Sequence, residues 1–162
     1  MSKIGTPLAN AELPYRKEFY LNLPLDRING ITAVDGVEYI DCDKDFEERY
    51  EDILGITWLK EEELTEILLA VKDTFTGYVE TKPLHNSQAK LSAAHQAELH
   101  NEYKAFEGYT FYTLTLKPNR ELYNTIYHNG ENIILLSPTR IRENMIQELT
   151  LSLEKMKSVR CE

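Results

Sequence analysis

The segment from Gly108 to Lys117 has the strongest strand pattern in the chain, with apolar, aromatic and threonine side chains at both its odd and its even positions. The even positions hold Thr110, Tyr112, Leu114 and Leu116, and the odd positions hold Tyr109, Phe111, Thr113 and Thr115. Successive side chains of a strand point to opposite faces of its sheet, and Tyr, Phe and Thr favour strands. Pro118 ends the run, and Asn119 is a suitable N-cap for a following helix. The segment therefore predicts a strand, and it is the clearest one in the chain.

The neighbouring segments set the order of elements from Leu64 onward. We expect strands at 64–72, near 89–93, at 108–117 and at 133–136, and helices at 74–82, 119–128 and from Pro138 onward. Residues 94–106, rich in Ala, Gln and Glu, fit either a hairpin extension or a helix. The order strand, helix, strand, strand, helix, strand is that of the split βαβ, ferredoxin-like fold. The sequence thus predicts an α+β sandwich, a βαββαβ unit with an added C-terminal helix.

Two features define that last helix. Ser137 precedes Pro138, which fits an N-cap followed by proline at the first helical position. A stripe of apolar residues spaced by three and four follows, consisting of Ile141, Met145, Leu149, Leu153 and Met156. Such a stripe predicts a helix with one face packed against the core.

The N-terminal part is less regular. Residues 1–14 contain proline, glycine and small polar residues without a period, which indicates a loose arm. Residues 18–34 alternate in short apolar and polar steps, which predicts two short strands. Asp35-Gly36 is a tight-turn signal between strand-like flanks.

A short acidic helix should follow. Asp45 is a suitable N-cap, apolar residues up to Leu54 share one face, and Gly55 suits the C′ position. Residues 57–63 have the composition of a linker. We therefore expect an N-terminal part at 15–58 and a ferredoxin-like part at 59–162.

Charge is unevenly distributed. The formal net charge is −9, and residues 41–66 carry eleven acids and three bases, a local net charge of −8. Phosphate binding depends on clustered Lys and Arg. The composition therefore argues against nucleic-acid binding by this chain alone.

Neither a membrane segment nor a secretion signal is apparent. No apolar run approaches the ~20 residues that span a bilayer, and Met1–Pro7 has no apolar core of a signal peptide. We expect a cytoplasmic protein without membrane contact. Cys42 and Cys161 are far apart, so both are expected to be free thiols.

Four segments together resemble the WYL family of bacterial transcriptional regulators. They are Leu25-Asp26-Arg27-Ile28, the acidic aromatic stretch Phe46–Ile56, the loop Lys82-Pro83-Leu84-His85-Asn86-Ser87-Gln88, and Leu135-Leu136-Ser137-Pro138 with Arg140 and Arg142. In the family, the first ends a small Sm-like barrel, and the others belong to the helix that follows it and to the C-terminal extension. The resemblance covers roughly residues 18–157 and lies in the family's order.

The resemblance implies a regulatory binding module. The family's barrel and C-terminal extension are thought to sense an effector, to help the protein dimerise and to pass the state to a DNA-binding domain. The Trp-Tyr-Leu triplet and the N-terminal helix-turn-helix of the family are absent, and Pro24 replaces the usual arginine before Leu-Asp-Arg-Ile. With about two strands, the barrel remnant cannot close alone. We expect either a truncation or strands completed by a partner chain, with DNA contacted only through the missing helix-turn-helix.

Six residues are candidates for contact with a small-molecule or nucleotide effector. They are Arg27, His85, Ser87, Gln88, Arg140 and Arg142. Arg27 follows from the resemblance, and the alternative is an ion pair with nearby acids. The three loop residues offer hydrogen-bonding groups beside a sheet, but they also suit capping and backbone contacts. The two helix arginines could hold an anion with the Ser137 cap or lie on a solvated face.

Enzymatic chemistry has little support in the sequence. His95 and His100 are five residues apart, which suits neither one helix face nor one strand face for a metal. No Gly-x-Ser-x-Gly elbow is present. Tyr109 and Phe111 resemble a base-stacking pair but lack the basic and glycine residues around it. We expect no cofactor, no metal and a homodimer. The alternative to effector sensing is a structural interaction module without a small ligand.

Overall fold

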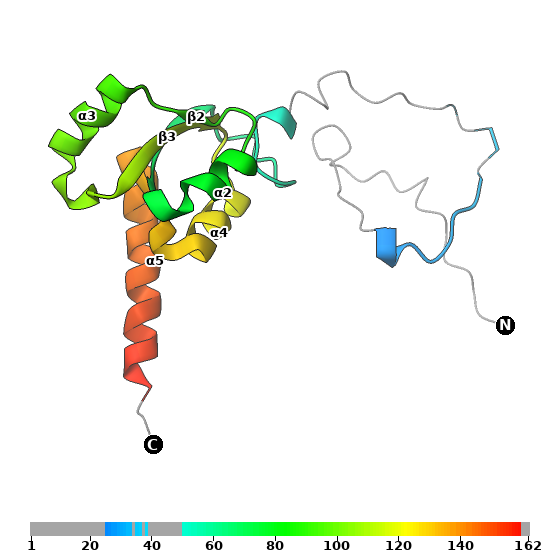
Figure 1. Ribbon diagram of the computed structural model, residues 1–162. Coiled ribbons are helices and arrows are strands. Elements are labelled where there is room, and N and C mark those ends of the chain that lie inside the picture. The colour runs from blue at the N-terminus through cyan, green and yellow to red at the C-terminus, as the bar shows by residue number, and fades with distance from the viewer. Residues whose placement is uncertain (1–24, 34, 37, 39–49, 160–162) are drawn as a thin grey trace. The chain divides into compact units, whose positions relative to one another are not determined.

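The computed structural model describes residues 25–33, 35, 36, 38 and 50–159, and the chain divides into two compact units, 1–40 and 41–162. The second unit contains a single sheet with helices around it (Figure 1). Among the described residues, no helix combines the length and the apolar character needed to cross a bilayer.

The regular elements of the second unit follow the predicted order. They are β1 Thr65–Lys72, η3 Asp73–Phe75, α2 Thr76–Thr81, β2 Ala89–Lys90, α3 Ala93–Glu102, η4 Lys104–Phe106, β3 Tyr109–Leu116, α4 Arg120–Asn129, η5 Gly130–Asn132, β4 Ile133–Ser137 and α5 Thr139–Ser158. The expected strands and helices after residue 64 are therefore present, within a few residues of their predicted ends.

The sheet has the strand order β2-β3-β1-β4, and each neighbouring pair is antiparallel. The central pair, β1 and β3, is in register over its full length, from Thr65 opposite Leu116 to Lys72 opposite Tyr109. The connection through α2 passes over β3, and the connection through α4 passes over β1. This arrangement confirms the predicted α+β, ferredoxin-like βαββαβ fold with an added C-terminal helix.

Strand alternation divides the apolar residues between the two faces of the sheet. On one face, buried side chains such as Leu69, Leu114 and Leu135 pack against α2, α4 and the start of α5. On the other face, Ala70, Phe111 and Leu136 pack against α3 and η4. The alternation predicted for β3 is therefore confirmed, and the sheet is covered on both sides.

Residues 94–106, for which the sequence allows either a hairpin extension or a helix, contain most of helix α3. Ser92 caps the helix, with its hydroxyl accepting a hydrogen bond from the backbone N–H of His95. The side-chain amide of Gln96 accepts from the backbone N–H of Phe111 at 2.9 Å and donates to its carbonyl at 2.7 Å. These bonds attach α3 to β3, so the segment is a helical excursion and not a hairpin extension.

Residues 50–58 lie in the same compact unit as the sheet. Ile53 is buried, and the carbonyl of Asp52 accepts from the backbone N–H of Lys117 at 2.7 Å. Asn119, which is 1% exposed, donates from its side-chain amide to the carbonyls of Leu54 and Thr57. The composition of the chain predicts a domain boundary near residue 58. In the structure, these contacts pack residues 52–57 against the start of α4.

The expected barrel remnant is not found among the described residues of the first unit. Leu25–Arg27 forms a short 3-10 turn, and residues 28–33 contain no strand. Leu25 and Ile31 are 84% and 87% exposed, so no layer covers the apolar positions that would stabilise a strand. The strand prediction is wrong at 25–33, and residues 18–24 lie outside the described part.

Two smaller turn predictions have different outcomes. Asp35 and Gly36 form the expected turn, with Gly36 at a φ of 77°. Residues 45–49 of the acidic helix lie outside the described residues, while Tyr50 and Glu51 are helical. Because the helix ends before Asp52, Gly55 is not its C′ residue; it occupies a later turn with a φ of 77°.

The last helix differs from its prediction at both ends. Ser137 ends β4, and Pro138 is the N-cap residue without a side-chain cap, so the proposed Ser137 cap is wrong. Of the predicted stripe, Ile141 and Met145 are buried, but Leu149, Leu153 and Met156 are exposed. The core of the described residues reaches only the first turns of α5, so the side chains of the second half do not pack against it.

Candidate functional site

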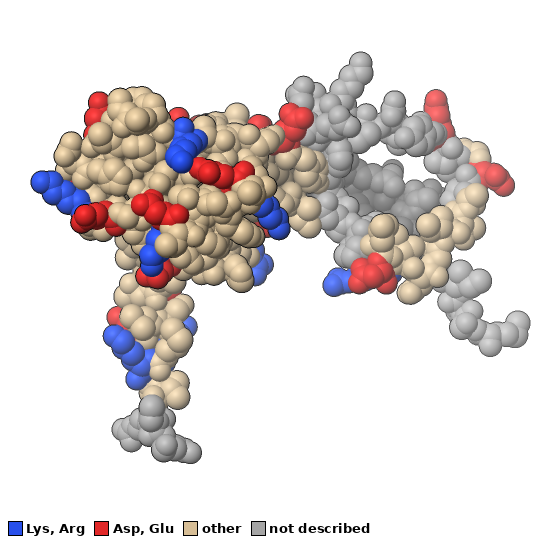
Figure 2. Space-filling model, in the orientation of Figure 1, with Lys and Arg blue, Asp and Glu red and all other residues tan. Residues whose placement is uncertain are grey.

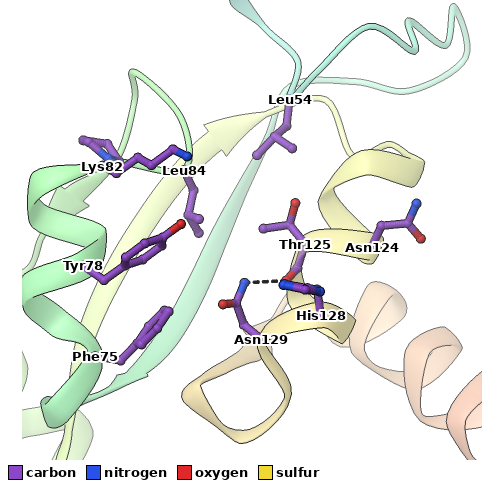
Figure 3. A pocket seen from close by; sticks show the side chains of 10 residues that line it. Leu54, Phe75, Tyr78, Lys82, Leu84, Asn124, Thr125, His128 and Asn129 are labelled. Atoms are coloured by element: carbon purple, nitrogen blue, oxygen red, sulfur yellow. Dashed lines mark hydrogen bonds between the residues drawn. The ribbon is translucent and has the colours of Figure 1, made fainter.

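A pocket of about 750 Å³ lies in the helical layer, between α2 and α4 (Figure 3). Its lining residues come from three stretches of the chain and are Leu54, Phe75, Tyr78, Lys82, Pro83, Leu84, Asn124, Thr125, His128 and Asn129. Small-molecule sites in proteins commonly have volumes of about 300–1,000 Å³. The pocket is therefore large enough for a metabolite or a mononucleotide.

The first wall is formed by α2 and the residues around it. Val79 is fully buried against the sheet, which fixes the orientation of this short helix. Tyr78 and Lys82 are four positions apart and so lie on one side of the helix, next to the pocket. The rings of Phe75 and Tyr78 pack with their centroids 4.9 Å apart. Pro83 follows the helix and prevents its continuation.

The second wall is one side of α4. Leu122 and Ile126 are buried beneath the helix, so the positions beside them face the pocket. In Figure 3, Thr125 and Asn129 lie across the cavity from Phe75 and Tyr78. The side-chain amide of Asn129 donates to the carbonyl of Thr125 at 2.7 Å, which restrains its rotamer.

The charge of the lining contrasts with that of the chain. Asp and Glu number 27 in the sequence against 18 Lys and Arg, yet no acid is among the described residues that line the pocket. The described lining includes the basic side chain of Lys82 and the imidazole of His128, whose ring nitrogens can form hydrogen bonds. Aromatic and aliphatic side chains form the rest of the first wall. This combination suits a ligand with an apolar or aromatic body and an anionic or acceptor-rich group.

The predicted loop residues His85, Ser87 and Gln88 lie beside this pocket but use their polar atoms within the fold. His85 Nδ1 lies 2.7 Å from Ser87 Oγ, and Ser87 Oγ also bonds to the backbone of Thr115, with N–H and carbonyl both at 2.9 Å. The loop is thereby fixed to the end of β3. Ligand contact by His85 and Ser87 stays a prediction, and their observed contacts match the structural alternative.

Gln88 has a direct relation to the pocket wall. Its Oε1 accepts from the backbone N–H of Leu84 at 3.0 Å, and its Nε2 donates to the carbonyl of Val79 at 2.8 Å. One side chain therefore closes the turn that carries Lys82, Pro83 and Leu84. We regard Gln88 as a residue that positions the wall, and its contact with ligand stays a prediction.

Arg140 and Arg142 do not line this pocket, and Arg27 belongs to the other compact unit. Arg27 is exposed in the 3-10 turn of the first unit. Arg140 forms an exposed ion pair with Glu62 at 3.2 Å, and Arg142 donates to the carbonyl of Leu136 at 3.0 Å. The anion site expected from Arg140, Arg142 and a Ser137 cap is not formed in this arrangement, because the cap is absent and each guanidinium has another partner.

The residues that line the pocket carry little signal in the sequence. Tyr78 and Lys82, and likewise Asn124 and His128, are spaced by four on their helices, which is the only local sign that they share a face. Nothing in that spacing indicates that the two helices lie side by side. Among the described residues, no group of three or more His, Cys, Asp or Glu side chains has the arrangement of a metal site.

No protein-family model matches the sequence, and no curated protein matches it.

Proposed function

We propose that this chain is the effector-sensing and dimerisation portion of a WYL-type bacterial transcriptional regulator, a ligand-responsive module without catalytic activity. The single observation that carries the proposal is the pocket between α2 and α4, whose described lining combines aromatic, aliphatic and basic side chains without an acid. The four motifs that resemble the family supply the regulatory context. On the family's pattern, a separate helix-turn-helix domain contacts DNA, and the module acts in the cytoplasm.

The ligand class follows from the lining. Phe75 and Tyr78 offer aromatic faces, and Lys82 with His128 offers donors to a carboxylate or phosphate. A mononucleotide or an aromatic carboxylate has both parts. Within the part of the chain that the structure describes, neither wall contributes a carboxylate that would repel such an anion.

A ligand that touches both walls would favour one separation of α2 and α4 over others. Binding energy that differs between two arrangements shifts their populations. Tyr127, on α4, donates from its hydroxyl to Glu148 on α5 at 2.8 Å, and burial raises the pKa of Tyr127 to about 12. Movement of α4 would therefore be transmitted to α5.

Thermal unfolding of the full chain with a panel of mononucleotides and aromatic carboxylates tests the proposal. We expect at least one compound to raise Tm, because a ligand that binds only the folded state stabilises it. Lys82→Gln and His128→Gln should each reduce that rise. Lys104→Gln, an exposed lysine outside this pocket, is the matched control and should retain it.

Two outcomes would contradict the proposal. One is an unchanged Tm across the whole panel. The other is a Tm rise that both pocket variants retain in full.

The alternative function is a structural interaction module that binds no small ligand. The exposed apolar residues on the second half of α5 favour it. Both functions include a second copy of the chain as the partner, so the pocket variants distinguish them and self-association alone does not.

A further inference from the structure

Among the described residues, none covers the second half of α5. Every residue from Ile146 to Val159 is exposed, whereas Ile141 and Met145 are buried. Figure 1 shows this half of the helix extending away from the sheet, and Figure 2 shows mostly uncharged atoms on its visible surface. An isolated helical segment of this length is only marginally stable in water. A partner surface would therefore stabilise it.

The exposed apolar residues form one seam along the helix. Ile146, Leu149, Leu153 and Met156 are spaced by three, four and three residues. They are between 47% and 66% exposed. This spacing is the a/d pattern of a two-stranded coiled coil. The seam therefore suits another helix with the same pattern.

An apolar groove of about 430 Å³ continues the seam toward the sheet. Ile146 and Leu149 belong to both, and the groove also contains Tyr103, Phe106 and Ile134. Arg142 is its charged residue, and the guanidinium is bonded to the carbonyl of Leu136. The apolar surface thus extends from the sheet edge at β4 along the free half of α5.

We propose that a second copy of this chain covers this surface. The two α5 seams pack antiparallel about a two-fold axis that crosses the interface at the level of residue 151. In that register, Ile146 lies opposite Met156 of the partner subunit, and Leu149 lies opposite Leu153 of the partner subunit. The end of the partner's helix then lies over the mouth of the groove. Each seam is buried by its own copy, as a symmetric interface requires.

The flanking charges favour the antiparallel direction. Glu143 and Lys157 occupy equivalent positions beside the seam, fourteen residues apart, which is two heptads. Antiparallel pairing brings Glu143 within one helical turn of Lys157 of the partner subunit, twice by symmetry. Parallel pairing, which joins an e position to the g position five residues earlier on the partner, instead places these residues near the uncharged Pro138 and Ser152 of the partner subunit. From Glu143 to Ser158 the helix has three acids and two bases, so two copies of this acidic chain can meet here with little repulsion.

This inference specifies the dimerisation that the proposed function includes, but it depends on α5 and not on the pocket. If the chain dimerises but binds no ligand, the proposed function fails and the α5 interface stands. If the chain binds ligand as a monomer, the α5 interface fails and the sensing function stands.

Sedimentation velocity of the full chain over the micromolar range tests it with two matched variants. Leu153 in the seam and Leu151 on the opposite side of the helix are 47% and 51% exposed. We expect a dimer, at least about tenfold weaker in Leu153→Arg because a charge replaces a central contact, and unchanged in Leu151→Arg. Circular dichroism should show that both exposed substitutions leave the fold intact.

A charge exchange tests the direction of the helices. Glu143→Lys and Lys157→Glu should each weaken the dimer, and the double variant should restore it. A wild-type monomer, a dimer that Leu153→Arg leaves unchanged, or charge variants without rescue would each overturn the proposal. It would equally be overturned if nuclear Overhauser contacts showed residues of the same chain over Leu149 and Leu153.

Discussion

The side-chain amide of Gln96 is hydrogen-bonded to both backbone polar groups of Phe111, in the manner of a neighbouring strand. β2 pairs with β3 only at Ala89 opposite Thr113 and Lys90 opposite Tyr112. The backbone N–H of Leu91 adds one more bond, to the carbonyl of Phe111, at 3.2 Å. Beyond that point no strand pairs with the edge of β3, and the side-chain amide of Gln96 on α3 forms the hydrogen bonds of the backbone N–H and carbonyl of Phe111.

Gln96→Ala should destabilise the chain by about 1–3 kcal/mol, because it leaves a partly buried N–H without its partner. Urea unfolding measures the loss, and hydrogen exchange localises it to the amide of Phe111. Gln96→Glu is the matched control, since it keeps the acceptor for that N–H and removes only the donor. Equal protection of Phe111 in the wild type and in Gln96→Ala would contradict the assigned role.

Two features of the structure favour glycine at position 55, its backbone conformation and a close neighbouring side chain. Its φ is 77°, and a Cβ at this position would lie 2.7 Å from Cγ of Glu121. Gly108 has a φ of 80° with nothing within 4 Å of a Cβ, so it isolates the backbone effect. We expect Gly108→Ala to lose about 1–2 kcal/mol of stability, and Gly55→Ala to lose more. Equal losses in denaturant unfolding would show that Glu121 moves aside without cost.

Asn119 supports two parts of the unit with one side chain. Its Oδ1 accepts from the backbone N–H of Leu122, and its Nδ2 donates to the carbonyls of Leu54 and Thr57. Asn119→Ala should cost about 2–4 kcal/mol through the lost cap and the two unpaired carbonyls. Asn119→Asp keeps the cap acceptor but turns a buried carboxylate toward two carbonyl oxygens. We expect it to be at least as harmful, whereas a simple capping role predicts that Asp is tolerated.

Two exposed carboxylates should contribute to the acid limb of the stability curve. The hydrogen bond from Lys90, followed by that from Tyr112, lowers the pKa of Glu80, and the hydrogen bond from Lys72 lowers the pKa of Glu131. Since the folded pKa lies below the unfolded value, each contribution is present above the unfolded pKa. It is lost as the pH falls through the folded pKa.

Glu80→Gln should therefore flatten the loss of stability between neutral and acidic pH. The effect should be small and should shrink in high salt, because both pairs are exposed. Free energies of unfolding measured across this pH range check the prediction, with Glu98→Gln on the exposed side of α3 as control. An acid limb unchanged by Glu80→Gln would contradict it.

The local signals in the sequence were reliable where one segment contained all the information. The alternation in 108–117 predicts both faces of β3, and Asn119 caps α4 as expected. Residues 94–106 stayed ambiguous because α3 depends on a partner outside itself, the backbone of Phe111. The strand prediction at 25–33 is wrong for a related reason. Apolar alternation describes one strand only, and a strand needs a neighbouring strand to pair with.

The candidate site was the harder part to predict. The loop His85–Gln88 was correctly recognised as rich in hydrogen-bonding groups, yet those groups join the loop to Val79, Leu84 and Thr115. The pocket lies beside it, on residues that look like ordinary helix surface. Arg140 and Arg142 likewise look available in the sequence but have partners in the structure.

The sequence by itself determined the order of the strands and helices apart from α3, the α+β class and the two faces of β3, because these depend on periodicity within a few residues. Only the tertiary structure decided that α2 and α4 form one pocket, since the strand order β2-β3-β1-β4 brings helices from distant segments side by side. It also decided that the apolar stripe of α5 is buried at Ile141 and exposed at Leu153. A stripe records which side of a helix is apolar, whereas the extent of the sheet beside it sets how much of that side is covered.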